Sequence, residues 1–375
     1  MPADLDLAVN CGSSSIKFSL YKSGSNQVVV QGSASNVAGD SPAKYKYSFM
    51  REGGQSDHKE KELESQMSYE DIFKEILRDV TQQEVLGDEG KARIRLVAHR
   101  IVHGGTADDP IVIRHGDKEE QETLDQMEAV SAFAPLHNHH AMLIVKECLE
   151  HLPDAYSVLC FDTLFHQTIP QFRRTYAISQ PEHKTPVPLV KYGFHGLSYA
   201  NIRDQMAEAL GKPKDAVNLV VAHLGSGGSC CLIRNGKSVQ TTMGVTPLEG
   251  EAVASFGHCI CASIDHFARP GLPGGTRSGT LDPSLIFHHT PDCSTTVKWS
   301  GRDISKAEYV LNKESGFRGA LQESSPVCQM RILTHPSRPG QPSAAPTTLA
   351  SSPRARSLPK ETRSNHLTTT TCRAG

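Results

Sequence analysis

Alternating apolar and polar positions near the start of the chain predict two short strands. Apolar residues alternate with polar ones over residues 5–9, and Ile16, Phe18 and Leu20 line one face of the next segment. The six residues between them read "NCGSSS", so the two strands are expected to pair as an antiparallel hairpin. A serine run is more common in linkers than in such a turn, which makes this turn a candidate for a special role.

Helical periodicity appears in two later segments. Ser68 is a predicted N-cap with Asp71 as its capping partner, and an apolar stripe follows at Ile72, Phe73, Ile76, Leu77 and Val80. A second helix is predicted over 198–210, with Gly211 ending it. Residues 51–67 are polar and charged, and are expected to form a surface loop.

Buried strands repeatedly end in polar residues beside glycines. Predicted strands cover 94–98, 158–161 and 217–222, and the last is followed by a glycine-serine loop, a second strand and an Asn235-Gly236 hairpin turn. In α/β proteins, ligands gather at such strand ends. Glycine-serine turns near residues 12 and 227 also suggest a duplicated domain with one phosphate loop in each half.

Composition narrows the class of protein. The 375 residues suggest two domains, and the 39 basic and 41 acidic side chains give no global field for a nucleic acid or membrane partner. The first ten residues show no signal peptide, and ten scattered cysteines are expected to stay reduced in the cytoplasm. The His258–Cys261 tract "HCIC" lacks a second ligand pair, so chance explains it better than a metal site.

The first glycine-serine turn has the groups that hold a phosphate. Its backbone N–H groups and hydroxyls can converge on an anion, Lys17 can reach a terminal phosphate, and Asn10 offers an oxygen for Mg²⁺. It is not a GxxxxGK[ST] loop. An ordinary hairpin turn with an exposed lysine is the alternative.

Five other polar residues are candidates, and each has a simpler explanation. Arg100 could form a surface ion pair, and His137 could be a buried core histidine. Asp162 and His195 could cap helices, and Arg277 could lie in a flexible loop.

Taken together and in order, the polar stretches resemble the acetate kinase family of the actin, Hsp70 and sugar-kinase superfamily. The matching stretches cover roughly residues 5–317 and read "VNCGSSSIKF", "AHRIVHGG", "APLHN", "FDTLFHQTIP", "YGFHGLSYANI", "HLGSGGS", "GKSVQTTMGVTPLEG" and "GGTRSGTLDPSLI". The resemblance implies an α/β fold of two RNase H-like domains around a cleft. It also implies reversible phosphoryl transfer from ATP to acetate with Mg²⁺, giving acetyl phosphate and ADP.

The resemblance also assigns roles to single residues. Arg100 matches the arginine that pairs with the acetate carboxylate, and the walls of the methyl pocket match Val102, Leu136, Phe194 and Pro247. The catalytic group matches Asp162, His195, Arg277 and His137. The phosphate-binding positions match Ser13, Ser15, Lys17, His223, Leu224, Gly225, Ser226 and Gly227, and the metal-associated position matches Asn10. Because acetate is already ionised, Asp162 is expected to orient Arg100 or a metal-bound water rather than to act as a base.

The chain departs from the family pattern in two places. Residues 251–271 separate "TPLEG" from "LPGGTRSG", which suggests an unspliced intron, and the resemblance stops after about residue 317. The predicted domains are therefore 1–165, an incomplete 166–320, and a disordered, non-family tail over 321–375. The tail replaces the expected adenosine site, a late Mg²⁺ ligand and the family's dimer surface.

Several functions remain open on the sequence alone. A propionate or butyrate kinase would share the site, and pyrophosphate could replace ATP as donor. A truncated, catalytically impaired family member, or the product of an incorrectly spliced gene, is an alternative of a different class. An actin-like or Hsp70-like structural ATPase would have no use for Arg100 and the small apolar pocket.

Overall fold

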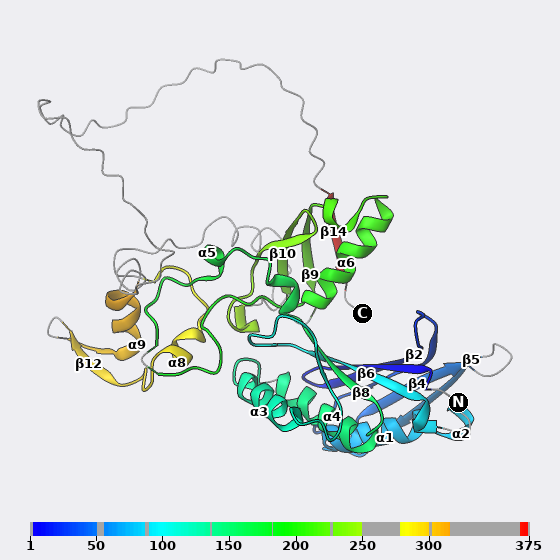
Figure 1. Ribbon diagram of the computed structural model, residues 1–375. Coiled ribbons are helices and arrows are strands. Elements are labelled where there is room, and N and C mark those ends of the chain that lie inside the picture. The colour runs from blue at the N-terminus through cyan, green and yellow to red at the C-terminus, as the bar shows by residue number, and fades with distance from the viewer. Residues whose placement is uncertain are drawn as a thin grey trace, which may run out of the picture.

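The protein is described from a computed structural model (Figure 1). The structure describes residues 3–50, 56–86, 90–135, 137–181, 183–225, 228–249, 278–299, 302–315 and 368–373. Two sheets form the centres of two lobes, and a small two-stranded sheet lies beside α8 and α9.

The first sheet has eight strands in the order β5-β4-β3-β2-β1-β6-β8-β7. The strands from β1 to β5 form an antiparallel meander, and β6 and β8 extend it on the other side of β1 as parallel neighbours. The bounds are Leu5–Cys11 for β1, Ser15–Lys22 for β2, Val28–Ser35 for β3, Lys44–Met50 for β4, Ser56–Glu62 for β5, Ile94–Ile101 for β6, Ile111–Ile113 for β7 and Tyr156–Phe161 for β8.

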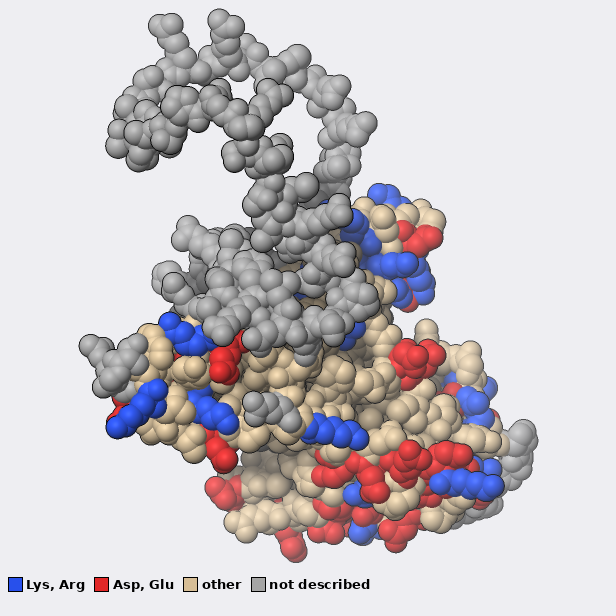
Figure 2. Space-filling model, turned by 60° about the vertical axis from the view of Figure 1, so that its left-hand side comes forward, with Lys and Arg blue, Asp and Glu red and all other residues tan. Residues whose placement is uncertain are grey.

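Helices α1 (Tyr69–Val80), α3 (Glu120–Ser131) and α4 (Asn138–His151) lie together along one side of this sheet (Figure 1). The predicted start of α1 is confirmed, because the Ser68 hydroxyl accepts a hydrogen bond from the Asp71 N–H at 3.1 Å. Its predicted apolar stripe is buried. On the face drawn in Figure 2, many acidic side chains gather on this lower lobe.

The second sheet has the order β11-β10-β9-β14. Its strands are β9 (Leu219–Leu224), β10 (Gly228–Arg234), β11 (Lys237–Thr241) and β14 (Thr368–Arg373). Helix α6 (Gly196–Ala209) packs on it through a small core that includes Tyr199, Ile202 and Val221. The Asn235-Gly236 turn predicted between β10 and β11 is confirmed, with φ values of 50° and 71°.

The remaining elements are short. They are α2 (Gln83–Leu86), α5 (Gln171–Arg174), α8 (Leu285–His289), α9 (Lys306–Tyr309), β12 (Thr296–Trp299), β13 (Arg302–Ser305), the 3₁₀ turns η1 (Gly90–Arg93), η2 (Leu164–His166), η3 (Lys214–Ala216) and η4 (Pro247–Glu249), and the π-helical turn η6 (Val310–Glu314). The boundary expected after residue 165 falls inside η2, and the domain limits themselves stay a prediction.

The two sheets repeat one arrangement of strands. The hairpin β1-β2 with β3 alongside corresponds to the hairpin β9-β10 with β11 alongside. β6 is parallel to β1, and β14 is parallel to β9 in the same position. The glycine-serine turn therefore joins the first two strands in each lobe, as the sequence pattern suggests.

The expectation of a loop over residues 51–67 is wrong for its central part. Residues 56–62 form β5 at the edge of the sheet, paired with β4. The period-two pattern is hidden because Lys59 and Lys61 stand where apolar residues are usual. Their ammonium groups lie over Tyr47 and Tyr45, at 5.9 and 5.3 Å from the ring centroids.

Six residues of the tail also differ from the expectation of disorder. Residues 368–373 pair with β9, which in the described residues has no other neighbour on that side. The segment begins with four threonines, which favour strands, and an open sheet edge offers unpaired backbone groups. Residues 316–367 lie outside the described residues.

Candidate functional site

Three candidate residues stand side by side where the strands of the first sheet end. Asn10 on β1 is opposite Lys17 on β2 and opposite Arg100 on β6 in the strand register. Residues directly opposite in neighbouring strands point to the same face of a sheet. The row Lys17-Asn10-Arg100 therefore places two cations and a neutral amide on one face, away from the helices.

Asp162 follows β8 directly and fixes the Arg100 side chain. Its Oδ2 atom accepts hydrogen bonds from Arg100 Nε at 3.1 Å and from Nη2 at 2.6 Å, and Asn10 Oδ1 lies 3.4 Å from Nη1. The Asp162 side chain is 3% exposed and that of Arg100 is 23% exposed, so this is not an ordinary surface pair. The orientation of Arg100 by Asp162 that the sequence suggested is present, and Asp162 does not cap a helix.

The first residue of α6, Gly196, packs against the backbone of Asp162. The Gly196 N–H donates to the Asp162 carbonyl oxygen at 2.9 Å, and a Cβ atom on residue 196 would lie 2.0 Å from that oxygen. Only glycine fits so close an approach. His195 precedes it in the left-handed conformation, with φ of 60° and ψ of 20°, and makes no side-chain capping bond. The strained turn thus presents His195 to the site instead of using it as a cap.

Two hydroxyl groups determine where His195 carries its proton. Its Nδ1 atom lies 2.8 Å from Ser229 Oγ, which lies 2.6 Å from the buried Tyr199 hydroxyl. In the described residues Tyr199 has no other acceptor, so it must donate to Ser229, whose own proton then goes to His195 Nδ1. The proton of a neutral His195 ring is therefore on Nε2. Burial lowers the pKa of His195 to about 4, so the neutral ring is the form present at neutral pH.

The ring of His223, on β9, stacks on the ring of His195. The two ring centroids are 4.2 Å apart and the rings are tilted by only 25°. Burial lowers the pKa of His223 as well, and His223 is the second cause of the low pKa of His195. Leu224 and Gly225 follow, ending β9 at the glycine-serine loop. The second predicted phosphate loop therefore begins beside His195.

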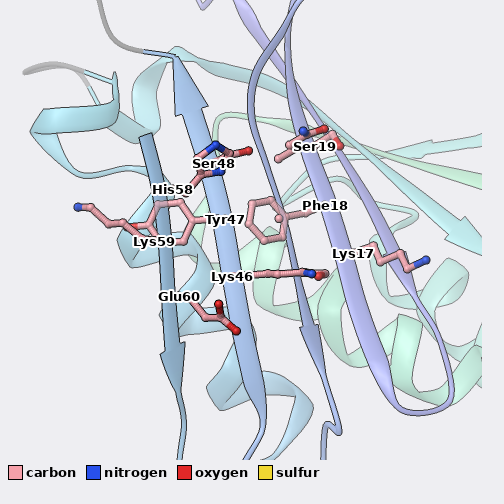
Figure 3. A pocket seen from close by; sticks show the side chains of 12 residues that line it. Lys17, Phe18, Ser19, Lys46, Tyr47, Ser48, His58, Lys59 and Glu60 are labelled. Atoms are coloured by element: carbon pink, nitrogen blue, oxygen red, sulfur yellow. The ribbon is translucent and has the colours of Figure 1, made fainter. Parts of the chain in front are cut away.

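The first glycine-serine turn is closed by backbone bonds. Gly12 N–H donates to the Ser15 carbonyl at 2.8 Å, and the Tyr69 hydroxyl donates to the Gly12 carbonyl at 3.1 Å. Ser13 lies in this exposed turn. Lys17 also borders an open cavity of about 690 Å³ on the outer face of β2–β5, with Lys46, His58 and Glu60 (Figure 3). That cavity continues the polar face of the sheet away from Arg100.

Two of the predicted pocket walls are close in sequence to site residues, since Val102 follows Arg100 by two positions and Phe194 directly precedes His195. Val102 and Phe194 are buried, with 4% and 1% exposure. Pro247 begins η4, and the preceding Thr246 is held by buried Asp282, which accepts from its N–H at 2.8 Å and from its hydroxyl at 2.9 Å. A fixed loop therefore carries the proline.

His137 precedes α4 and makes no capping bond. Its pKa is lowered, first by burial and then by the Arg100 charge. Four predicted site residues, Leu136, Ser226, Gly227 and Arg277, lie outside the described residues, as does the 251–271 segment.

Sequence reasoning assigned no site role to five residues that support the site. These are Ser229, Tyr199, Asp282 and two fully buried histidines, His103 and His166. All five stand in or beside the quoted motifs, so position in a motif was the available indication. Serine and tyrosine in a strand or helix carry no pattern of their own that separates a supporting role from ordinary packing.

Two oxygen-bearing side chains, Asn10 and Asp162, are the groups in the described cluster that suit a hard cation. No group of three or more His, Cys, Asp or Glu side chains that could hold a metal occurs in the described part of the chain. No helix among those residues is long and apolar enough to span a membrane.

Comparison with known proteins shows which family the chain resembles. A model of the acetokinase family matches residues 5–255. The chain is 43% identical over 313 residues to a probable acetate kinase of Cryptococcus neoformans var. neoformans serotype D, covering 83% of this chain and 66% of that protein. It is 34% identical over 324 residues to an acetate kinase of Borreliella burgdorferi, covering 85% and 69%.

Solved structures agree with the sequence relatives. A propionate kinase from Francisella tularensis has a TM-score of 0.53 and 30% identity, covering 84% of this chain and 69% of that one. An acetate kinase from Entamoeba histolytica has a TM-score of 0.52 and 26% identity, covering 83% and 66%.

The fold and the site define a two-domain α/β protein of the actin and Hsp70 type, with a cationic cluster at the ends of its parallel strands. The match over residues 5–255 assigns a more particular place. The chain belongs to the acetokinase family, and it spans 66% of the length of the Cryptococcus relative and 62% of a probable acetate kinase of Chaetomium globosum.

Proposed function

We propose that this protein catalyses reversible phosphoryl transfer from ATP to acetate, giving acetyl phosphate and ADP. The observation that carries the proposal is the Arg100 guanidinium, which Asp162 holds on β6, two residues before the buried apolar side chain of Val102. A cation next to a small apolar wall suits a short carboxylic acid. A cytoplasmic location belongs to the same proposal.

Arg100 would bind the acetate carboxylate. Asp162 takes one N–H from Nε and one from Nη2, so the Nη1 side of the guanidinium and the second Nη2 proton remain directed away from Asp162. A carboxylate can accept two parallel hydrogen bonds from such an edge. Acetate is ionised at neutral pH, so Asp162 needs to take no proton and serves to position Arg100.

His195 would act on the transferring phosphoryl group as a neutral donor. The Tyr199-Ser229 chain fixes its proton on Nε2, the nitrogen that does not face Ser229. A preorganised N–H aimed at developing negative charge stabilises the transition state. Arg277 is proposed as the cationic partner of His195, and His137 as a nearby polar contact.

The two glycine-serine turns would hold the phosphates of ATP. Ser13 lies in the first turn, and Ser15 and Lys17 follow it on β2. The second phosphate-binding stretch is His223 to Gly227, including Leu224, Gly225 and Ser226. Backbone N–H groups of tight turns bind anions without base or sugar recognition. This part of the proposal therefore covers the phosphates rather than the adenosine.

Mg²⁺ is proposed as the metal; Asn10 would supply an oxygen to it, directly or through water, and Asp162 would be a second oxygen-bearing group in the same cluster. One or two protein oxygens suffice, because Mg²⁺ in kinases is bound largely by phosphates and water. When bound, it would neutralise charge on the phosphates.

The proposal is tested by trapping acetyl phosphate with hydroxylamine. The chain is incubated with acetate and MgATP beside a version that lacks residues 251–271 and carries the C-terminal third of the Cryptococcus relative. If only the altered version forms product, the catalytic site is functional but needs the added C-terminal part or the removal of residues 251–271. No product from either, with both folded, would contradict the kinase assignment.

A truncated, impaired family member is the second candidate. The chain covers only 66% of its Cryptococcus relative, and β14 from the tail stands at the edge of the second sheet. Propionate remains an alternative substrate, as the similarity to the Francisella propionate kinase suggests.

Ser229→Ala is expected to lower kcat about tenfold while leaving the KM for acetate unchanged, because the variant no longer fixes the His195 proton on Nε2. Steady-state kinetics of acetyl hydroxamate formation measure this. Ser229→Thr keeps the hydroxyl and should retain most of the activity. Unchanged kcat in Ser229→Ala would contradict the proposed role of the hydroxyl.

A further inference from the structure

His103 is a fully buried histidine two residues after the end of β6, next to Val102. Both of its ring nitrogens are used. Nδ1 accepts from the Gly105 N–H at 3.0 Å, so Nε2 carries the proton and donates it to the Val245 carbonyl at 3.1 Å. The second bond joins residues 142 positions apart in the chain and reaches the loop that leads to Pro247.

The backbone of His103 is fixed by a second buried residue. Asn138 Oδ1 accepts from the His103 N–H at 2.9 Å, and Asn138 Nδ2 donates to the His103 carbonyl at 2.8 Å. Asn138 is fully buried and begins α4, directly after His137. This pair of bonds is equivalent to one step of a strand ladder and ties the end of β6 to α4.

Aromatic rings surround the imidazole. The centroid of Tyr192 lies 4.5 Å from that of His103, and Phe194 meets it edge-on at 5.4 Å. Phe133 lies at 5.8 Å. The ring therefore touches Phe194 directly, and Phe194 is one of the proposed walls of the acyl pocket.

His103 thus connects the described segments that bear Val102, Phe194 and Pro247. Val102 is its chain neighbour, Phe194 packs on its ring, and Val245 leads to Pro247 through Thr246. Asn138 links it to the start of α4. Buried polar side chains with all partners satisfied hold their surroundings in one arrangement.

We propose that His103 is a positioning residue that sets the width of the acyl pocket and thereby the preference for acetate over longer carboxylic acids. The inference rests on the proposed function, since it concerns the substrate class of the same site. His103 itself does not touch the reacting atoms.

The test compares acetate with propionate in His103→Leu and His103→Gln. Leucine removes both ring hydrogen bonds, and glutamine can keep the donor to Val245. We expect kcat/KM for propionate relative to acetate to rise about tenfold in His103→Leu and about threefold in His103→Gln, because a methylene is worth roughly 10-fold to 200-fold in a tight pocket. The KM for ATP should stay the same in both.

A matched control stands on the same strand. His99 is also buried, and its Nε2 lies 3.3 Å from Ser157 Oγ on β8, so its side-chain hydrogen bond goes to a different segment from the Val245 and Asn138 bonds of His103. His99→Gln should lose stability without a change in the propionate-to-acetate ratio. A similar rise of that ratio in His99→Gln would overturn the inference, since general loosening would then explain it.

Binding of the two acids by the full chain gives a readout that does not need turnover. Saturation-transfer NMR with acetate and with propionate measures the two dissociation constants for the unmodified chain and each variant. The ratio of constants should shift toward propionate in His103→Leu, or in His103→Gln if the leucine variant does not fold. Binding of both acids with an unchanged ratio overturns this inference alone. Failure of the unmodified chain to bind either acid overturns the carboxylate site and the inference with it.

Discussion

Arg100→Lys is expected to reduce kcat/KM for acetate by a factor of about 10³ while keeping the positive charge. Arg100 is held by two hydrogen bonds to one oxygen of Asp162, which leaves its other N–H groups for Asn10 and for the proposed carboxylate. A lysine ammonium can pair with Asp162 or with a carboxylate, but it lacks the planar fork that serves both together. Most of the loss should appear in the KM for acetate and in kcat, with the KM for ATP little changed.

Arg95 supplies the matched control on the same strand. It pairs with Asp6 at 2.8 Å on the exposed surface, so Arg95→Lys should leave the kinetics within about twofold. Acetyl hydroxamate formation measures both variants, and circular dichroism shows whether they fold. Equal activity of Arg100→Lys and the unmodified protein would show that carboxylate binding does not depend on the guanidinium, and the proposed substrate site would then be elsewhere.

Much of the fold could be predicted from local sequence patterns. The hairpin at its start, the capped helix α1 and the Asn235-Gly236 turn are each specified by local residues: alternation, a Ser68 cap and a positive-φ pair. Strand β5 could not be predicted in this way. The half-buried side of β5 carries Lys59 and Lys61, whose ammonium groups lie over aromatic rings of β4, and that contact exists only after the two strands have paired.

The site residues also differ in whether local sequence patterns could predict them. Asn10, Arg100 and Asp162 could be predicted because polar residues at the ends of buried strands meet at one edge of a parallel sheet. Ser229 and His103 could not be predicted. Ser229 contacts His195, 34 positions away, and His103 contacts Val245, 142 positions away. No local sequence pattern predicts contacts between residues so far apart in the chain.

Acid is expected to destabilise the protein strongly between pH 6.5 and pH 4, because several histidines are buried in neutral form. Burial lowers the pKa of His99 to about 3 and the pKa values of His103 and His166 to about 4. In the unfolded chain each of these histidines has a pKa near 6.5. The rings are satisfied as neutral groups, for example His166 between Ser238 Oγ and the Phe194 carbonyl, both at 2.9 Å.

The sign of the effect follows from which state binds more protons. Above pH 6.5 neither state protonates these rings, and their full contribution to stability is present. As the pH falls toward 4, the unfolded chain takes up protons that the folded protein cannot accept, so the free energy of unfolding decreases. Each ring should cost on the order of 1–2 kcal/mol by pH 5, and three together approach the total stability of about 5–15 kcal/mol typical of a folded protein.

Urea unfolding at pH 7 and pH 5, at constant ionic strength, measures this loss directly. Most carboxylates stay ionised over this range, so histidines dominate the change. His99→Gln should be less stable than the unmodified protein at pH 7 but should lose less stability on going to pH 5, since one of the buried rings with a lowered pKa is gone. An unfolding free energy that is the same at both pH values would mean that the folded protein accepts these protons. The neutral, donor-acceptor assignment of the buried rings, on which the roles of His103 and His166 depend, would then be wrong.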